Sequence, residues 1–133
     1  MARILVIEDE ALMRKAIAIS LQRAGHVVVT ADNGKHGVNL YMETRPDLVL
    51  TDLMMPEKDG VETIIEIRRA DPSAKIIAMS GAALGAEVFL PAAKTLGAIR
   101  ILSKPLDATQ IVQTVAQVLA QQDGGAPAAP ASP

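Results

Sequence analysis

Six residues that could do chemistry together follow four apolar runs of this chain, and each run is typical of a buried strand. They are Glu8 and Asp9, Asp52, Ser80 and Gly81, and Lys104. In an open parallel sheet, ligands bind just beyond the carboxyl ends of the strands, so these residues would meet at one edge. Three carboxylates, a hydroxyl and an ammonium are groups that bind a metal ion and a phosphate. The sequence therefore predicts a site for phosphoryl transfer.

The elements that must position these residues alternate between strand and helix five times. Apolar runs predict strands over 2–7, 27–29, 47–51, 75–79 and 99–102. Apolar residues at helical spacing predict helices over 10–24, 35–44, 60–70, 87–96 and 107–121. Strands that are apolar almost throughout favour a parallel sheet buried on both faces, and the alternation favours a doubly wound α/β fold. We expect Gly25 to end the first helix and Asp107 to cap the start of the last.

The composition limits the classes of protein to which the chain can belong. Its 133 residues predict one domain over 1–122, followed by a disordered tail rich in Gly, Ala and Pro over 123–133. A formal net charge of −2 provides no basic surface for nucleic acid, and no apolar run reaches the roughly 18 residues of a membrane span. The chain has no cysteine for a disulfide, and its first strand begins too early to leave room for a signal peptide. We therefore expect a cytoplasmic protein that binds neither nucleic acid nor membrane.

The order of these motifs resembles the response-regulator receiver domain of two-component signalling, in its stand-alone, chemotaxis-regulator-like form. The resemblance covers residues 2–121 and rests on one ordered set of motifs: Glu8-Asp9, Asp52, Met55-Pro56, Asp59-Gly60, Ser80-Gly81 and Lys104-Pro105. Each motif alone is weak, but all of them in this order are specific. The resemblance implies a flavodoxin-like fold with five helices and a five-stranded parallel sheet in the order 2-1-3-4-5.

The resemblance also implies a role for each residue of the predicted site. Asp52 would accept a phosphoryl group from a histidine kinase or a histidine phosphotransfer protein, and the phosphorylated protein would act on an unidentified downstream partner. Mg²⁺ would be held by Asp9, by Asp52, by the backbone carbonyl of Met54 and, through water, by Glu8. Ser80, Gly81 and Lys104 would contact the phosphoryl group once it is present. The protein would not be an enzyme beyond catalysing its own phosphorylation and slow dephosphorylation.

Two alternatives to a phosphorylation switch stay open. The first is a docking module that works without phosphorylation, although such a module has no need of a complete acidic set. The second is a phosphatase with an aspartate nucleophile on a similar sheet, but such enzymes need a second aspartate two residues later, where this chain has Met54. Two positions of the site depart from the family pattern. Ile101 stands where an aromatic residue often lies, so an inward swing of a ring is not available, and Glu8 replaces the Asp that is more common in the acidic pair.

Overall fold

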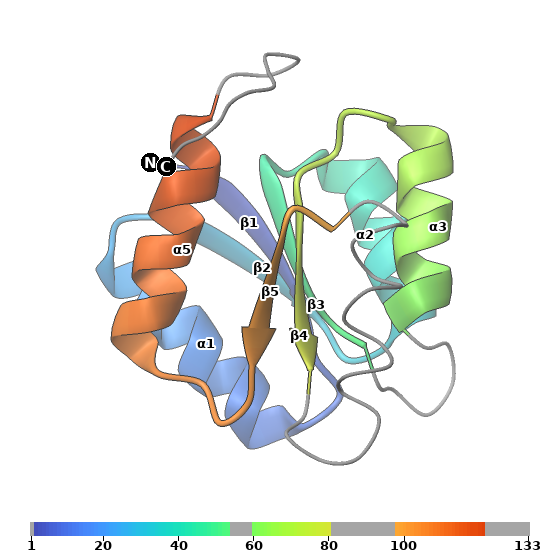
Figure 1. Cartoon of the computed structure of the whole chain (residues 1–133). Helices are drawn as coiled ribbons and strands as arrows, with labels where there is room; N and C mark the ends of the chain where they lie inside the picture. Colours follow the sequence, from blue (N-terminus) through green and yellow to red (C-terminus); the bar gives the residue numbers. More distant parts are fainter. Residues whose placement is uncertain (1, 54–59, 81–97, 122–133) are drawn as a thin grey trace.

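The computed structural model describes residues 2–53, 60–80 and 98–121, which form a single sheet covered by helices on both faces (Figure 1). The strands are β1 (Arg3–Ile7), β2 (Val27–Ala31), β3 (Leu48–Asp52), β4 (Ile76–Ser80) and β5 (Arg100–Ser103). The described helices are α1 (Ala11–Arg23), α2 (Gly34–Thr44), α3 (Gly60–Ala70) and α5 (Ala108–Ala120). The helix that we expect near 87–96, the loop over 81–86 and the tail over 123–133 lie outside the described residues.

The sheet has the order β2-β1-β3-β4-β5, and each neighbouring pair of strands is parallel. The predicted flavodoxin-like, doubly wound fold is therefore confirmed. Strand β1 lies between β2 and β3, with Ile4 paired to Val28 on one side and to Leu48 on the other. This is the point where the strand order reverses, and ligands of doubly wound sheets bind beyond it.

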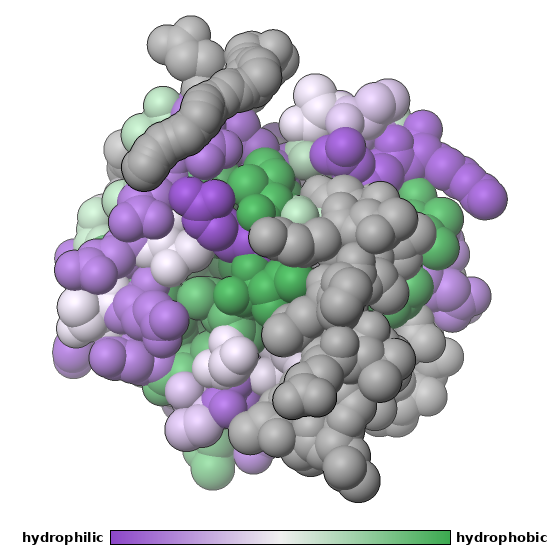
Figure 2. Space-filling model, viewed as in Figure 1, coloured by the Kyte–Doolittle hydropathy of each residue, from purple (hydrophilic) through white to green (hydrophobic). Residues whose placement is uncertain are grey.

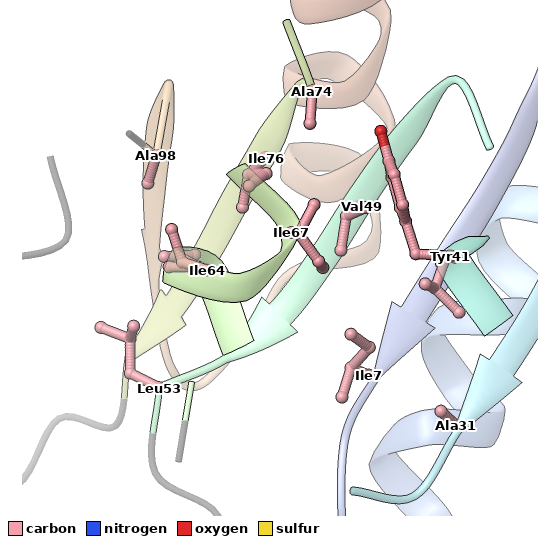
Figure 3. Close-up of a cluster of buried hydrophobic side chains, with 12 residues drawn as sticks. Ile7, Ala31, Tyr41, Val49, Leu53, Ile64, Ile67, Ala74, Ile76 and Ala98 are labelled. Atoms are coloured by element: carbon pink, nitrogen blue, oxygen red, sulfur yellow. The ribbon is translucent and has the colours of Figure 1, made fainter. Parts of the chain in front are cut away.

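Two aliphatic layers hold the helices to the sheet, because side chains of successive strand residues point to opposite faces. On one face, Ile7, Val49 and Ile76 pack with Tyr41 of α2 and with residues of α3 (Figure 3). Its buried members are Leu5, Ile7, Ala31, Tyr41, Val49, Leu53, Ile64, Ile67, Ala74, Ile76, Ala78 and Ala98. Ile101, one of the two departures from the family pattern, is half-buried and packs against this layer.

The opposite face of the sheet is covered by α1 and α5. Its buried members are Ile4, Val6, Ile17, Leu21, Leu48, Leu50, Ile77, Met79, Leu102, Ile111, Val115 and Val118. Strands β3 and β4 are buried at every position because they contribute to both layers, whereas β2 lies at an edge and is partly exposed. In the view of Figure 2, hydrophobic residues gather near the centre over β5, and hydrophilic ones lie over α5.

The predicted caps are confirmed, and the predicted strand ends need small corrections. Asp107 caps α5 by accepting a hydrogen bond from the backbone N–H of Thr109 at 2.9 Å. Gly25 follows α1 with a φ of +97°, a conformation that favours glycine. Strand β2 continues to Ala31, and Asp52 is the last residue of β3 instead of following it. In the described part of the chain, no helix combines the length and the apolar character needed to cross a membrane.

Candidate functional site

The candidate site lies at the carboxyl edge of the sheet, because four neighbouring strands end there. Strands β1 and β3 are paired up to Ile7 and Thr51, which places Glu8 and Asp9 beside Asp52. On the other side of β3, strands β4 and β5 are paired up to Ser80 and Ser103. The backbone N–H of Lys104, the residue after β5, donates a 2.7 Å hydrogen bond to the carbonyl of Ser80. The topology thus brings five of the six predicted residues to one edge.

Three carboxylates form the centre of this site. One oxygen from each of Glu8, Asp9 and Asp52 can be chosen so that all three lie within 4.8 Å of one another. Glu8 is fully buried and Asp52 is 4% exposed, whereas Asp9 faces solvent. The carboxylates of Glu8 and Asp52 are therefore held in place by the fold, and Asp9 closes the cluster from the open side.

Lys104 contacts two of these carboxylates at once. Its Nζ lies 2.9 Å from Oε1 of Glu8 and 3.0 Å from Oδ2 of Asp52, and the side chain is 19% exposed. Burial lowers the pKa of Lys104, but the hydrogen bonds to Glu8 and Asp52 outweigh it and leave the pKa raised. The ammonium is thus charged and bridges two acids. The peptide bond between Lys104 and Pro105 is cis.

Glu8 is the most constrained acid of the cluster. Its second carboxylate oxygen, Oε2, accepts a hydrogen bond from the backbone N–H of Glu10 at 3.1 Å. Its backbone carbonyl accepts a 2.9 Å hydrogen bond from the guanidinium of Arg14, one turn into α1. Burial raises the pKa of Glu8, the hydrogen bond from Lys104 opposes that rise, and the nearby charge of Asp52 adds to it.

Sequence reasoning missed the pairing of Glu8 with Lys104. It assigned Glu8 only a contact with metal through water and Lys104 only a contact with phosphate. The structure adds a direct ion pair between these two residues, which lie 96 positions apart. The residue type at position 8 could have suggested this pairing, because glutamate has one more methylene than the aspartate that is more common at this position in the family and so reaches farther. The contact of Arg14 with the backbone carbonyl of Glu8 was not predicted either. Every residue has such a carbonyl, so this contact has no sequence motif.

Gly60, which the sequence offered only as part of a motif, permits close packing under Asp52. Its backbone N–H donates a 3.0 Å hydrogen bond to the carbonyl of Leu53, so α3 begins directly against the end of β3. A Cβ at Gly60 would overlap the backbone carbonyl of Asp52 and the Cα of Leu53. The hydroxyl of Thr51 donates to the same Asp52 carbonyl at 3.1 Å. This packing fixes the backbone that carries the central carboxylate.

The remaining predicted residues are partly accounted for. Ser80 ends β4 and is 2% exposed, on the strand next to that of Asp52. Gly81 and Met54, the latter predicted to offer its backbone carbonyl to a metal, lie outside the described residues. The roles that we assigned to all of these residues stay predictions, because placement alone does not test them.

The donor set fits a small, hard divalent cation such as Mg²⁺. All of its side-chain ligand atoms are carboxylate oxygens, which Mg²⁺ prefers. When the three acids are ionised, their combined negative charge exceeds the charge of the Lys104 ammonium, which contacts two of them. Like charges this close repel one another, and a divalent cation relieves the repulsion. Asp9, Asp52 and Glu8 are thus the described residues that could hold the ion.

Sequence comparison with known proteins identifies one family and several relatives. The family described as response regulator receiver domain matches residues 4–116. The chemotaxis protein CheY of Thermotoga maritima is 36% identical over 117 residues, which cover 87% of this chain and 96% of the relative. The chemotaxis protein CheY of Bacillus subtilis is 37% identical over 118 residues, with coverages of 88% and 97%.

Solved structures agree with these sequence matches. A response regulator receiver domain protein from Clostridium thermocellum superposes with a TM-score of 0.84 at 29% identity, and the match covers 90% of this chain and 94% of that one. The chemotaxis protein CheY4 of Vibrio cholerae gives a TM-score of 0.81 at 26% identity, with coverages of 89% and 98%. From its sequence, its strand order and the acids at its carboxyl edge, this chain belongs to the response regulator receiver domain family.

Proposed function

We propose that this protein is a signalling switch that accepts a phosphoryl group on Asp52. The donor would be a phosphohistidine of a histidine kinase or a histidine phosphotransfer protein. The phosphorylated protein would then change its binding to a downstream protein or pass the phosphoryl group on. Phosphorylation on an aspartate is general to receiver domains. The observation that carries the proposal is the contact of Asp52 with Lys104 beside two further carboxylates.

The chemistry follows from the positions of the side chains. An oxygen of the Asp52 carboxylate attacks the phosphorus, so that an O–P bond forms while the P–N bond to the donor imidazole breaks. The bonding electron pair returns to the imidazole nitrogen. The Lys104 ammonium, 3.0 Å from Oδ2 of Asp52, lies where it can neutralise a phosphoryl oxygen that gains charge. The hydroxyl of Ser80 and the backbone N–H of Gly81 would donate hydrogen bonds to the acyl phosphate.

Receiver domains bind Mg²⁺ at an acidic pocket, and the cluster described above would serve that purpose here. Asp9 and Asp52, with the backbone carbonyl of Met54, would hold the ion, and Glu8 would act through water. A bound ion would supply positive charge for the phosphoryl oxygens in addition to that of the Lys104 ammonium. The proposal includes a cytoplasmic location.

Incubation with acetyl phosphate tests the proposal without knowledge of the natural partner. In the presence of Mg²⁺, intact-mass measurement should show one added phosphoryl group, and chelation of the metal should prevent the addition. Peptide mapping should place the group on Asp52. An unmodified mass under these conditions, or a group on another residue, would contradict the proposal. A phosphatase would instead release phosphate over many turnovers, and a docking module would bind its partner without any mass change.

A further inference from the structure

Strand β2 forms one end of the sheet, and within the described residues no strand pairs with its outer side. The N–H of Val27 and the carbonyl of Ala31 form hydrogen bonds of 2.8 and 3.0 Å with residues that flank β1. Since the backbone groups of successive residues point to opposite sides of a strand, those of Val28 and Thr30 point away from β1. Two N–H groups and two carbonyls of β2 therefore face the open side of the strand.

Apart from its short length, β2 lacks the features that protect an edge strand from pairing, which are charges, proline and bulges. Its sequence, Val-Val-Val-Thr-Ala, has neither a charge nor a proline, and it pairs with β1 in an unbroken register. Val27 is 45% exposed. At the other end of the described sheet, β5 differs because it begins with the charged Arg100. The open side of β2 can therefore accept a further strand.

A second copy of β2 fits this edge in an antiparallel register. A two-fold axis at Val29 places Val28 opposite Thr30 of the partner subunit, so the outward N–H and carbonyl groups of one strand meet those of the other. Both residues are β-branched, and both lie on the same face of the sheet because they are two positions apart. Side chains of this kind pack well as cross-strand neighbours.

The ends of the strand are complementary in the same register, which places His26 opposite Asp32 of the partner subunit. Nδ1 of His26 accepts a hydrogen bond from the backbone N–H of Ala2 at 3.2 Å, so the proton of the neutral ring lies on Nε2, which is a donor. Asp32 is exposed, and although its Oδ1 accepts from the amide of Asn33 at 2.9 Å, a carboxylate has further acceptor sites. A shift of the register by two residues would lose this match of donor and acceptor.

We propose that this protein forms a dimer in which the β2 strands of two copies pair antiparallel and join two sheets into one. The dimer goes beyond the proposed function and does not rest on it, because the site at the carboxyl edge takes no part in the pairing. Antiparallel pairing directs the carboxyl edges of the two sheets to opposite ends of the dimer, so both sites stay open. Two five-residue strands make a small contact, so the dissociation constant is in the range of about 10–100 µM.

Sedimentation of the full chain measures this association. We expect a mass near the monomer value of 14.0 kDa at about 1 µM and close to twice that value at about 1 mM, with or without acetyl phosphate. Thr30→Lys places a charge on both sides of the two-fold axis and should weaken the association about tenfold or more. Thr109→Lys makes the same change at an exposed position of α5 and should leave the association unchanged. If Thr30→Lys fails to fold, Thr30→Pro removes the outward N–H without removing a hydrogen bond to β1.

Hydrogen exchange of single amides identifies the surface that pairs. At the concentration that gives the dimer, exchange should slow at the N–H groups of Val28 and Thr30, whereas that of Val27 is already bonded on the β1 side and should not change. A mass that stays monomeric at about 1 mM would overturn the proposal and leave this edge for a strand of another protein. A dimer in which the amides of Val28 and Thr30 exchange as in the monomer would also overturn it, because the copies would then meet through another surface. Failure of the proposed function is a separate result, since it appears as a protein that takes up no phosphoryl group.

Discussion

The two edges of the sheet use acidic residues in opposite ways. At the carboxyl edge, Glu8 and Asp52 share the ammonium of Lys104, and Asp9 lies close to both acids. At the amino edge, each acid has hydrogen-bond donors of its own. Asp71 accepts from the hydroxyl of Tyr41 at 2.6 Å and from the backbone N–H and hydroxyl of a nearby serine, and Asp47 accepts from a backbone N–H at 2.9 Å.

The pKa values of one acid at each edge are shifted in opposite directions. The hydrogen bond from Tyr41, with help from Ser73, lowers the pKa of Asp71, so the fold favours its anion. Burial raises the pKa of Glu8 despite the hydrogen bond from Lys104, so the fold disfavours that anion. Asp71 at the amino edge therefore stabilises the protein near neutral pH, whereas the Glu8 carboxylate at the carboxyl edge is kept at some cost. Strained electrostatics of this kind is typical of a functional site.

Two matched substitutions should have the largest effects, because one should abolish phosphorylation and the other should lower thermal stability. Asp52→Asn should fold, because the change is nearly isosteric, and should accept no phosphoryl group from acetyl phosphate. Asp71→Asn at the amino edge should be phosphorylated like the wild type but melt at a lower temperature. Intact mass and thermal unfolding measure the two properties. Phosphorylation of Asp52→Asn at another residue would contradict the comparison.

Substitution of one glycine at each edge tests how closely the backbone is packed there. Gly60→Ala should cost about 3 kcal/mol or more, because its Cβ would overlap the rigid backbone of Asp52 and Leu53. Gly25→Ala at the amino edge has open space around it and should cost only about 1–2 kcal/mol, from its φ of +97°. Urea unfolding gives both values. Equal costs would mean that the close approach under Asp52 is relaxed in solution.

Tyr41→Phe tests the source of the stabilisation at the amino edge. Loss of the hydroxyl removes a hydrogen bond to a carboxylate and should cost about 1–3 kcal/mol at neutral pH. Because the pKa of Asp71 is lowered on folding, its contribution is full above the unfolded value of 3.8 and is lost as the pH falls below that value. Unfolding measured across this range should show a shallower acid dependence in Tyr41→Phe. An identical slope in both proteins would assign the dependence to other acids.

The smallest expected effect concerns His26, whose Nδ1 accepts a 3.2 Å hydrogen bond from the backbone N–H of Ala2. Burial lowers its pKa, so the fold favours the neutral imidazole, and stability should fall as the pH drops below the unfolded value of 6.5. His26→Gln should remove this dependence, with an effect well below about 1 kcal/mol because the site is screened. His36→Gln on the exposed side of α2 is the control. A larger pH effect in the control would refute this assignment.

The elements were largely predictable from the sequence for physical reasons, whereas the order of the strands was predicted from the family resemblance. Strands β3 and β4 are buried on both faces, so their residues must be apolar throughout and are easy to recognise. Helix caps such as Asp107 leave a local signal because a side chain replaces a missing backbone partner. Strand ends were less certain, as for β2, which continues to Ala31, because an edge strand is partly exposed and its pattern fades.

By itself the sequence predicted the candidate residues of the site and where along the chain each one lies, because each lies at or just beyond the end of a recognisable strand. It did not determine which of them touch. The ion pair of Glu8 with Lys104 spans 96 positions, and the packing of Gly60 against Asp52 depends on where α3 meets the end of β3. Only the tertiary structure decided these contacts. They depend on side-chain length and on the approach of separate elements, and both are set by the packing of the whole sheet.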